Sequence, residues 1–290
     1  MLFRSDIKDE AISRAFTVKD LILGITKALR GAKGIRPEED QALPLMSGYW
    51  KKHLQVLPKE EHLGALEFST GFSAWLLRFS ITAIDCLIFK LFFRIKAEGA
   101  ENVPKVGAYI LYPNHASDLD GPAITACLPR RPVFQLFYFL FIPYFFRPYV
   151  KSRLLRDLIK MERFIPFDYS THFLEALRSA YLVLQRGKGL CFFPEGLRST
   201  TGEVGVFKKG LGILAKETGA LLVPVAIEGA YEAWPSTAKY PKCYPIRVRF
   251  GKPLLVEDLE KEGLAMGAQN CYDAICVAAR RALIELKTRS

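Results

Sequence analysis

The chain has 290 residues, which is enough for one large domain with an extension. Half of its residues are hydrophobic and 12% are aromatic, a composition that excludes a wholly disordered chain. The formal net charge of +11 predicts a polyanionic partner, and nucleic acid, an anionic bilayer and a phosphorylated substrate all fit charge alone. The six cysteines form no CxxC pair and no Cys/His cluster, so we expect buried thiols, no metal site and no cofactor.

The first 93 residues differ from the rest of the chain. Residues 1–64 are more polar and lack strand patterns, and we interpret them as a helical extension of unknown role. Residues 65–93 are rich in Phe and Leu, yet Arg78, Asp85 and Lys90 interrupt them. Three charges argue against a spanning helix, so we expect an amphipathic helix in the bilayer interface. Packing of this helix on the protein's own sheet is the alternative.

From residue 94 onward, strand patterns alternate with helical ones. This alternation is typical of an α/β domain, here residues 94–290, with a largely parallel sheet flanked by helices. The predicted strands are Arg94–Glu98, Ala108–Tyr112, Val133–Tyr138, Arg163–Phe167, Gly189–Phe193, Leu221–Ile227 and Ile246–Phe250. The predicted helices cover residues 120–128, 142–160, 171–186, 206–218 and 256–288.

A histidine and an aspartate follow the second predicted strand in the segment LYPNHASDLDG, residues 111–121. His115 and Asp120 are five residues apart, which on one continuous helix leaves them about 140° apart. They can meet only across a turn, for which Ser117 or Asp118 is a natural helix N-cap. The carboxylate could then hold the ring and leave Nε2 free to accept a proton from a hydroxyl. A purely structural histidine is the alternative.

A second polar motif, FFPEGLRS, ends the fifth predicted strand, where ligands bind in open α/β sheets. Gly196 lets the backbone approach a ligand closely, and Arg198 could hold a phosphate with two parallel hydrogen bonds. Lys208 and Lys209 of the following FKKG stretch would add positive charge, unless they belong to a solvated surface turn.

Four ordered motifs together resemble those of the glycerophospholipid acyltransferase family. His115–Asp120 matches the family's HxxxxD motif, and Phe193–Ser199 matches FPEGTRS with Leu197 in the threonine position. Phe207–Gly210 and Val223–Ile227 match two later stretches. The resemblance implies His115 as general base, Asp120 as its partner and Glu195 in the catalytic group. It also implies that Glu195, Gly196 and Arg198 contact the acceptor head group and that Pro224 belongs to the pocket wall. The further substrate-binding residues that we expect are Ser199, Arg163 and Lys208.

The second family motif departs from this pattern. It is expected to end in an arginine that contacts the acceptor's phosphate, but the stretch RFIPFDY places Tyr169 there. Either Arg163 or Arg198 supplies the charge, or the acceptor's head group is not glycerol phosphate. We favour a different or relaxed acceptor.

Membrane contact is expected at a further site. Residues 134–150 contain nine Phe or Tyr side chains, which favour a lipid interface, and basic residues surround them. The basic residues lie beside bulky apolar runs, which argues against nucleic acid as the partner. We therefore expect a peripheral or monotopic protein on the cytoplasmic face of the cell membrane.

The predicted function is transfer of a fatty acyl group from acyl-CoA or acyl carrier protein to the hydroxyl of a lysophospholipid. The acceptor would be 1-acylglycerol-3-phosphate or a related glycerolipid. An acyl thioester hydrolase and a non-catalytic lipid-binding protein are the alternatives. Cys191 lies close to the FPEG motif, but strand alternation favours a core thiol over an acyl-cysteine intermediate.

Overall fold

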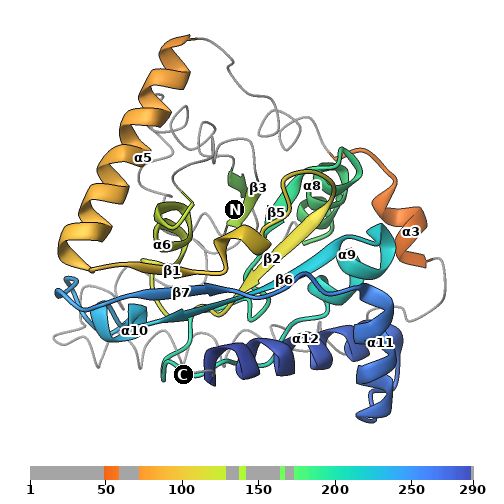
Figure 1. The fold of residues 1–290 in the computed structure, drawn as a ribbon. Helices are drawn as coiled ribbons and strands as arrows, with labels where there is room; N and C mark the ends of the chain where they lie inside the picture. The colour runs from red at the N-terminus through yellow and green to blue at the C-terminus, as the bar shows by residue number, and fades with distance from the viewer. Residues whose placement is uncertain (1–48, 59–71, 129–136, 142–163, 167–172, 289–290) are drawn as a thin grey trace, which may run out of the picture. The chain divides into compact units, whose positions relative to one another are not determined.

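The computed structural model describes residues 49–58, 72–128, 137–141, 164–166 and 173–288. Its centre is a seven-stranded sheet in the order β1-β7-β6-β2-β5-β3-β4 (Figure 1). All neighbouring strands pair in parallel except β6 and β7, which are antiparallel. The predicted largely parallel α/β sheet is therefore confirmed in these residues.

The central strands are buried on both faces, as their continuous apolar sequences predict. The strands are β1 (Lys96–Glu98), β2 (Tyr109–Pro113), β3 (Phe137–Phe141), β4 (Phe164–Pro166), β5 (Gly189–Cys191), β6 (Leu221–Glu228) and β7 (Arg247–Phe250). All five residues of β2 are buried, and β2 lies between β5 and β6. Because β2 and β5 are parallel, the loops that follow them leave the same edge of the sheet.

Helices cover both faces of the sheet (Figure 1). On one face, α5 (Phe72–Phe92) contacts α6 (Asp120–Ala126), and Phe89 and Phe93 join the core with Leu111 and Val223. On the other face, α12 (Cys271–Thr288) packs on β6 and on α9 (Gly210–Thr218), while α8 (Phe173–Gln185) packs against α9. Short elements complete the described fold: α3 (Tyr49–Leu54), the 3-10 helix η1 (Ala100–Asn102), α10 (Ala230–Ala233) and α11 (Val256–Ala265).

The predicted elements differ from the observed ones mainly at helix ends. The expected helix 256–288 is two helices, because Gly267 adopts a positive φ of 93° and Asn270 then accepts the N–H of Asp273. The helix expected from residue 206 begins only at Gly210. Strand β3 begins four residues later than predicted and ends at Phe141. Residues 137–141 of the aromatic run at 134–150 therefore belong to the sheet. The predicted helix 142–160 lies outside the described residues, as do the basic residues expected to surround that run.

The region before residue 94 contains two described helices. Helix α3 lies within the predicted extension 1–64, and its Trp50 and Leu54 are buried. Arg178 of α8 donates a hydrogen bond to the carbonyl of His53 at 2.9 Å, which ties α3 to the α/β layer. Helix α5 occupies the predicted interfacial segment 65–93. In the part of the chain that the structure describes, no helix is long and apolar enough to cross a membrane.

Two glycines allow α12 to approach its neighbours closely. A Cβ on Gly212 of α9 would lie 2.2 Å from the carbonyl oxygen of Tyr272, and one on Gly263 of α11 would lie 2.0 Å from that of Ala274. Backbone cannot move aside as a flexible side chain can, so α12 depends on these residues having no side chain.

Replacing Gly212 with alanine should therefore destabilise the protein, even though alanine favours helix. We expect Gly212→Ala to lower the free energy of unfolding by about 1–2 kcal/mol through overpacking, measured by urea denaturation. Gly210→Ala is the control, because its Cβ would meet the Phe192 ring at an ordinary 3.4 Å. Equal stabilities of the two variants would contradict this packing argument.

Candidate active site

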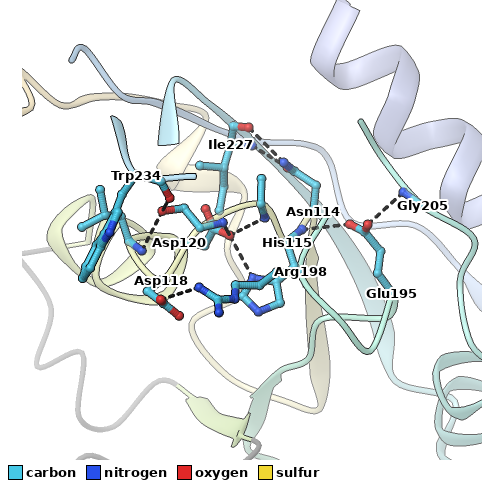
Figure 2. Close-up of polar contacts among 12 residues, drawn as sticks. Asn114, His115, Asp118, Asp120, Glu195, Arg198, Gly205, Ile227 and Trp234 are labelled. Atoms are coloured by element: carbon cyan, nitrogen blue, oxygen red, sulfur yellow. Dashed lines mark hydrogen bonds and ion pairs between the residues drawn. The ribbon is translucent and has the colours of Figure 1, made fainter. Parts of the chain in front are cut away.

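The imidazole of His115 and the carboxylate of Asp120 meet across a turn at the end of β2 (Figure 2). One carboxylate oxygen, Oδ2 of Asp120, lies 2.9 Å from His115 Nδ1 and also accepts the N–H groups of Ala116 at 2.7 Å and Ser117 at 2.8 Å. Since this oxygen already accepts two backbone protons, Nδ1 carries the proton in their contact. The lone pair of the neutral ring is therefore on Nε2.

The turn between the two residues is anchored to neighbouring elements. The Asn114 side chain donates to the Ile227 carbonyl at 3.0 Å and accepts the Ile227 N–H at 2.7 Å, which joins the end of β2 to β6. The Ser117 hydroxyl donates to the Trp234 carbonyl at 2.9 Å. The expected N-cap is wrong in detail, because α6 begins at Asp120 and Leu119 precedes it without a side-chain cap. Asp120 itself closes the turn, because its carboxylate accepts the N–H groups of Ala116 and Ser117.

Glu195 is held entirely by backbone amides in this structure. Its Oε1 accepts the His115 N–H at 2.8 Å, and its Oε2 accepts the Gly205 N–H at 2.8 Å. A Cβ on Gly205 would lie 2.9 Å from Oε2, so a side chain there would displace the Glu195 carboxylate. Burial raises the pKa of Glu195, and the two amide hydrogen bonds oppose that rise. These contacts make Glu195 a link between the backbone of His115 and the loop at residues 202–206.

Two basic residues of α12 hold the other side of that loop. Arg280 donates to the carbonyls of Gly205 at 2.7 Å and Val204 at 2.8 Å, and Lys287 donates to that of Gly202 at 2.9 Å. Both residues also line a cleft of about 450 Å³ that reaches Ala116, next to His115. Sequence reasoning missed them, since only helical spacing is visible around residues 280 and 287.

The FPEG motif brings a cation to the same edge. Gly196 has a positive φ of 75°, which turns the chain after Glu195, and the Ser199 N–H donates to the His115 carbonyl at 2.7 Å. The Arg198 guanidinium then forms an ion pair with Asp118, inside the HxxxxD segment (Figure 2). The structure thus brings together His115, Asp120, Glu195, Gly196, Arg198 and Ser199.

Of the other predicted residues, Lys208 contacts the motif through its backbone, while the described contacts of Lys209 and Pro224 lie elsewhere. The Lys208 N–H donates to the Pro194 carbonyl at 2.7 Å, but the ammonium of Lys209 lies 3.7 Å from Asp273 of α12. Pro224 lies within β6, where its carbonyl accepts the N–H of Gly251. A Cβ on Gly251 would lie 2.6 Å from the Pro224 ring, so that ring lies against Gly251. Arg163 and Tyr169 lie outside the described residues.

Cys191 is fully buried in β5, beneath the motif. Burial raises the pKa of its thiol well above the ordinary value, so the thiolate that an acyl-cysteine intermediate needs is disfavoured. This supports a core thiol. Within the described ranges, no three His, Cys, Asp or Glu side chains are grouped so that they could hold a metal ion.

The raised pKa of Glu195 predicts a dependence of stability on pH. An acid whose pKa is higher in the folded state binds more protons there, so stability falls as the pH rises from about 4.5 through the raised pKa. Glu195→Gln removes this titration. We therefore expect wild type to lose stability relative to Glu195→Gln over that window, measured by urea unfolding at a series of pH values. A constant difference between the two proteins would contradict the buried carboxylate.

Comparison with known proteins finds similarity to acyltransferases. Residues 94–228 match the family model Acyltransferase. The chain is 30% identical to a 1-acyl-sn-glycerol-3-phosphate acyltransferase of Cocos nucifera over 169 residues, which cover 58% of this chain and 52% of that protein. It is also 30% identical to a chloroplastic 1-acyl-sn-glycerol-3-phosphate acyltransferase of Arabidopsis thaliana over 147 residues, 50% of this chain and 39% of that one.

A solved structure shares the fold. The crystal structure of the 1-acyl-sn-glycerophosphate acyltransferase PlsC of Thermotoga maritima superimposes with a TM-score of 0.57 at 23% identity, covering 79% of this chain and 87% of that one. The chain spans about half the length of the curated relatives it matches. The resemblance found in the four motifs is thereby confirmed: residues 94–228 match an acyltransferase family model, and the curated relatives that the chain matches are 1-acyl-sn-glycerol-3-phosphate acyltransferases.

Proposed function

We propose that the protein transfers a fatty acyl group from acyl-CoA or acyl carrier protein to the free hydroxyl of a lysophospholipid. The acceptor is 1-acylglycerol-3-phosphate or a related glycerolipid. The observation that supports this proposal is the contact of Asp120 Oδ2 with His115 Nδ1, because a proton donated from Nδ1 leaves the Nε2 lone pair to act as a base. The named activity of the curated relatives agrees with it.

The reaction needs no covalent enzyme intermediate. His115 Nε2 accepts the proton of the acceptor hydroxyl while that oxygen attacks the carbonyl carbon of the thioester. The tetrahedral intermediate then collapses, the carbon–sulfur bond breaks, and the departing thiolate takes the proton from Nε2. The buried Asp120 carboxylate stabilises the imidazolium that exists between these two steps. Each proton and bond is accounted for by donor, acceptor and one histidine.

Removing the base should abolish transfer without unfolding the protein. We expect His115→Ala to lower kcat by at least about 100-fold, the usual contribution of a general base, in an assay of ester product with lysophosphatidate and acyl-CoA. His53→Ala is the matched control, because His53 bonds within α3 to the Tyr49 carbonyl at 2.8 Å. Full activity of His115→Ala would disprove the proposed mechanism. Release of free fatty acid as the main product with lysolipid in excess would indicate a thioester hydrolase instead.

We also propose that the protein acts at a membrane surface, where such acceptors are dissolved. Among the side chains that the structure describes, Cys86 and Phe89 near the end of helix α5 pack on the core, as does Phe93 just after it. The large hydrophobic side chains exposed along it are Leu76, Phe79, Ile84, Leu87, Ile88, Leu91 and Phe92. An apolar helix face of this extent supports lipid docking. Because α5 contacts α6, whose first residue is Asp120, docking there would bring the proposed active site near the bilayer.

Charges on that face should release the protein from lipid. We expect a much smaller fraction of the double variant Leu87→Glu/Leu91→Glu than of wild type to sediment with anionic phospholipid vesicles. The reason is that two carboxylates would have to enter the apolar layer of the bilayer. Val106→Glu is the control, because Val106 is 85% exposed but lies outside α5. Equal loss of vesicle binding by both variants, or none by either, would contradict docking through α5.

A further inference from the structure

Asp118 is an acidic residue that lies between His115 and Asp120 in the sequence. It takes no part in the hydrogen bond between those two side chains. Its carboxylate forms an ion pair with the Arg198 guanidinium, and about 30% of each side chain is exposed. Figure 2 shows Arg198 directed toward Asp118 from the loop that follows β5. The pair therefore joins the loops at the ends of β2 and β5, the edge at which the acceptor would bind.

The ion pair competes with the use expected of Arg198. Arginine binds a phosphate best when the fork of its guanidinium faces two phosphate oxygens. Asp118 already occupies the Nη1 atom of that fork. A phosphate that approaches Arg198 must either displace the Asp118 carboxylate or bind beside it. If it binds beside it, the negative charges of the phosphate and the carboxylate repel one another. Binding beside the carboxylate weakens the affinity most for the phosphate that carries the most charge, because the repulsion by Asp118 grows with that charge.

We propose that Asp118 is a residue that determines acceptor selectivity in this protein. By holding Arg198, it disfavours lysolipids with a doubly charged phosphate monoester relative to those with a singly charged phosphodiester head group. This inference rests on the proposed acyl transfer for its biological meaning, but the competition between Asp118 and a phosphate can be measured without catalysis.

The direct test is binding of glycerol 3-phosphate, a soluble phosphate monoester, to the full chain by calorimetry. We expect Asp118→Asn to bind it about two- to fivefold more tightly than wild type, as the loss of a partly exposed competing ion pair predicts. In a protein that also carries Arg198→Gln, Asp118→Asn should increase the affinity for glycerol 3-phosphate much less, because Asp118 and the phosphate compete for Arg198. Unchanged affinity in Asp118→Asn, or equal tightening with and without Arg198, would overturn the proposal.

Kinetics provide the second readout. The ratio of kcat/KM for lysophosphatidate to that for a lysophosphatidylcholine with the same acyl chain should rise in Asp118→Asn, and the change should be in KM. An equal decrease for both acceptors would show a merely structural role and overturn the proposal. Failure of wild type to acylate either lipid would instead refute the proposed function, while the binding measurement would still decide the role of Asp118.

Discussion

One buried oxygen atom organises the proposed active site. Asp120 Oδ2 accepts hydrogen bonds from the His115 ring and from the two N–H groups that follow it in the chain. The side chain of Asp120 is fully buried, so these bonds form where water competes little for the carboxylate. The same three contacts close the turn, start α6 and set the tautomer of the imidazole. A change at this oxygen would disturb local structure and proposed chemistry together.

Contacts from outside the turn also hold the backbone of His115 in place. The N–H of His115 is bound by Glu195, Glu195 binds Gly205, and Gly205 accepts a bond from Arg280 of the C-terminal helix. This series of contacts crosses the sheet edge and ends in α12, beyond the residues 94–228 that match the family model. The close approach of α12 at Gly212 is therefore connected to the geometry of His115. Helix α12 acts as a support for the site rather than as an appended element.

The sequence allowed the sheet and the meeting of His115 with Asp120 to be predicted, for physical reasons. Strand periodicity located β2 and β5, and parallel strands must place their following loops at one edge. A spacing of five residues forced a turn between the two side chains. The partners of Glu195 could not be predicted, because tertiary packing alone brings the N–H groups of His115 and Gly205 to its carboxylate. The ion pair of Asp118 with Arg198 joins residues 80 positions apart and leaves no local pattern in the sequence. The assignment of residues 1–64 as a helical extension stays a prediction.

The most direct test of this account is the tautomer of the His115 ring. Long-range proton–nitrogen NMR spectra of the protein with nitrogen-15 histidine distinguish the two ring nitrogens, and a His115→Ala sample assigns the signal. The account predicts a neutral ring with its proton on Nδ1 and a free lone pair on Nε2. A neutral ring protonated on Nε2 would contradict it, because Asp120 would then not orient His115 and no base would face the acceptor hydroxyl.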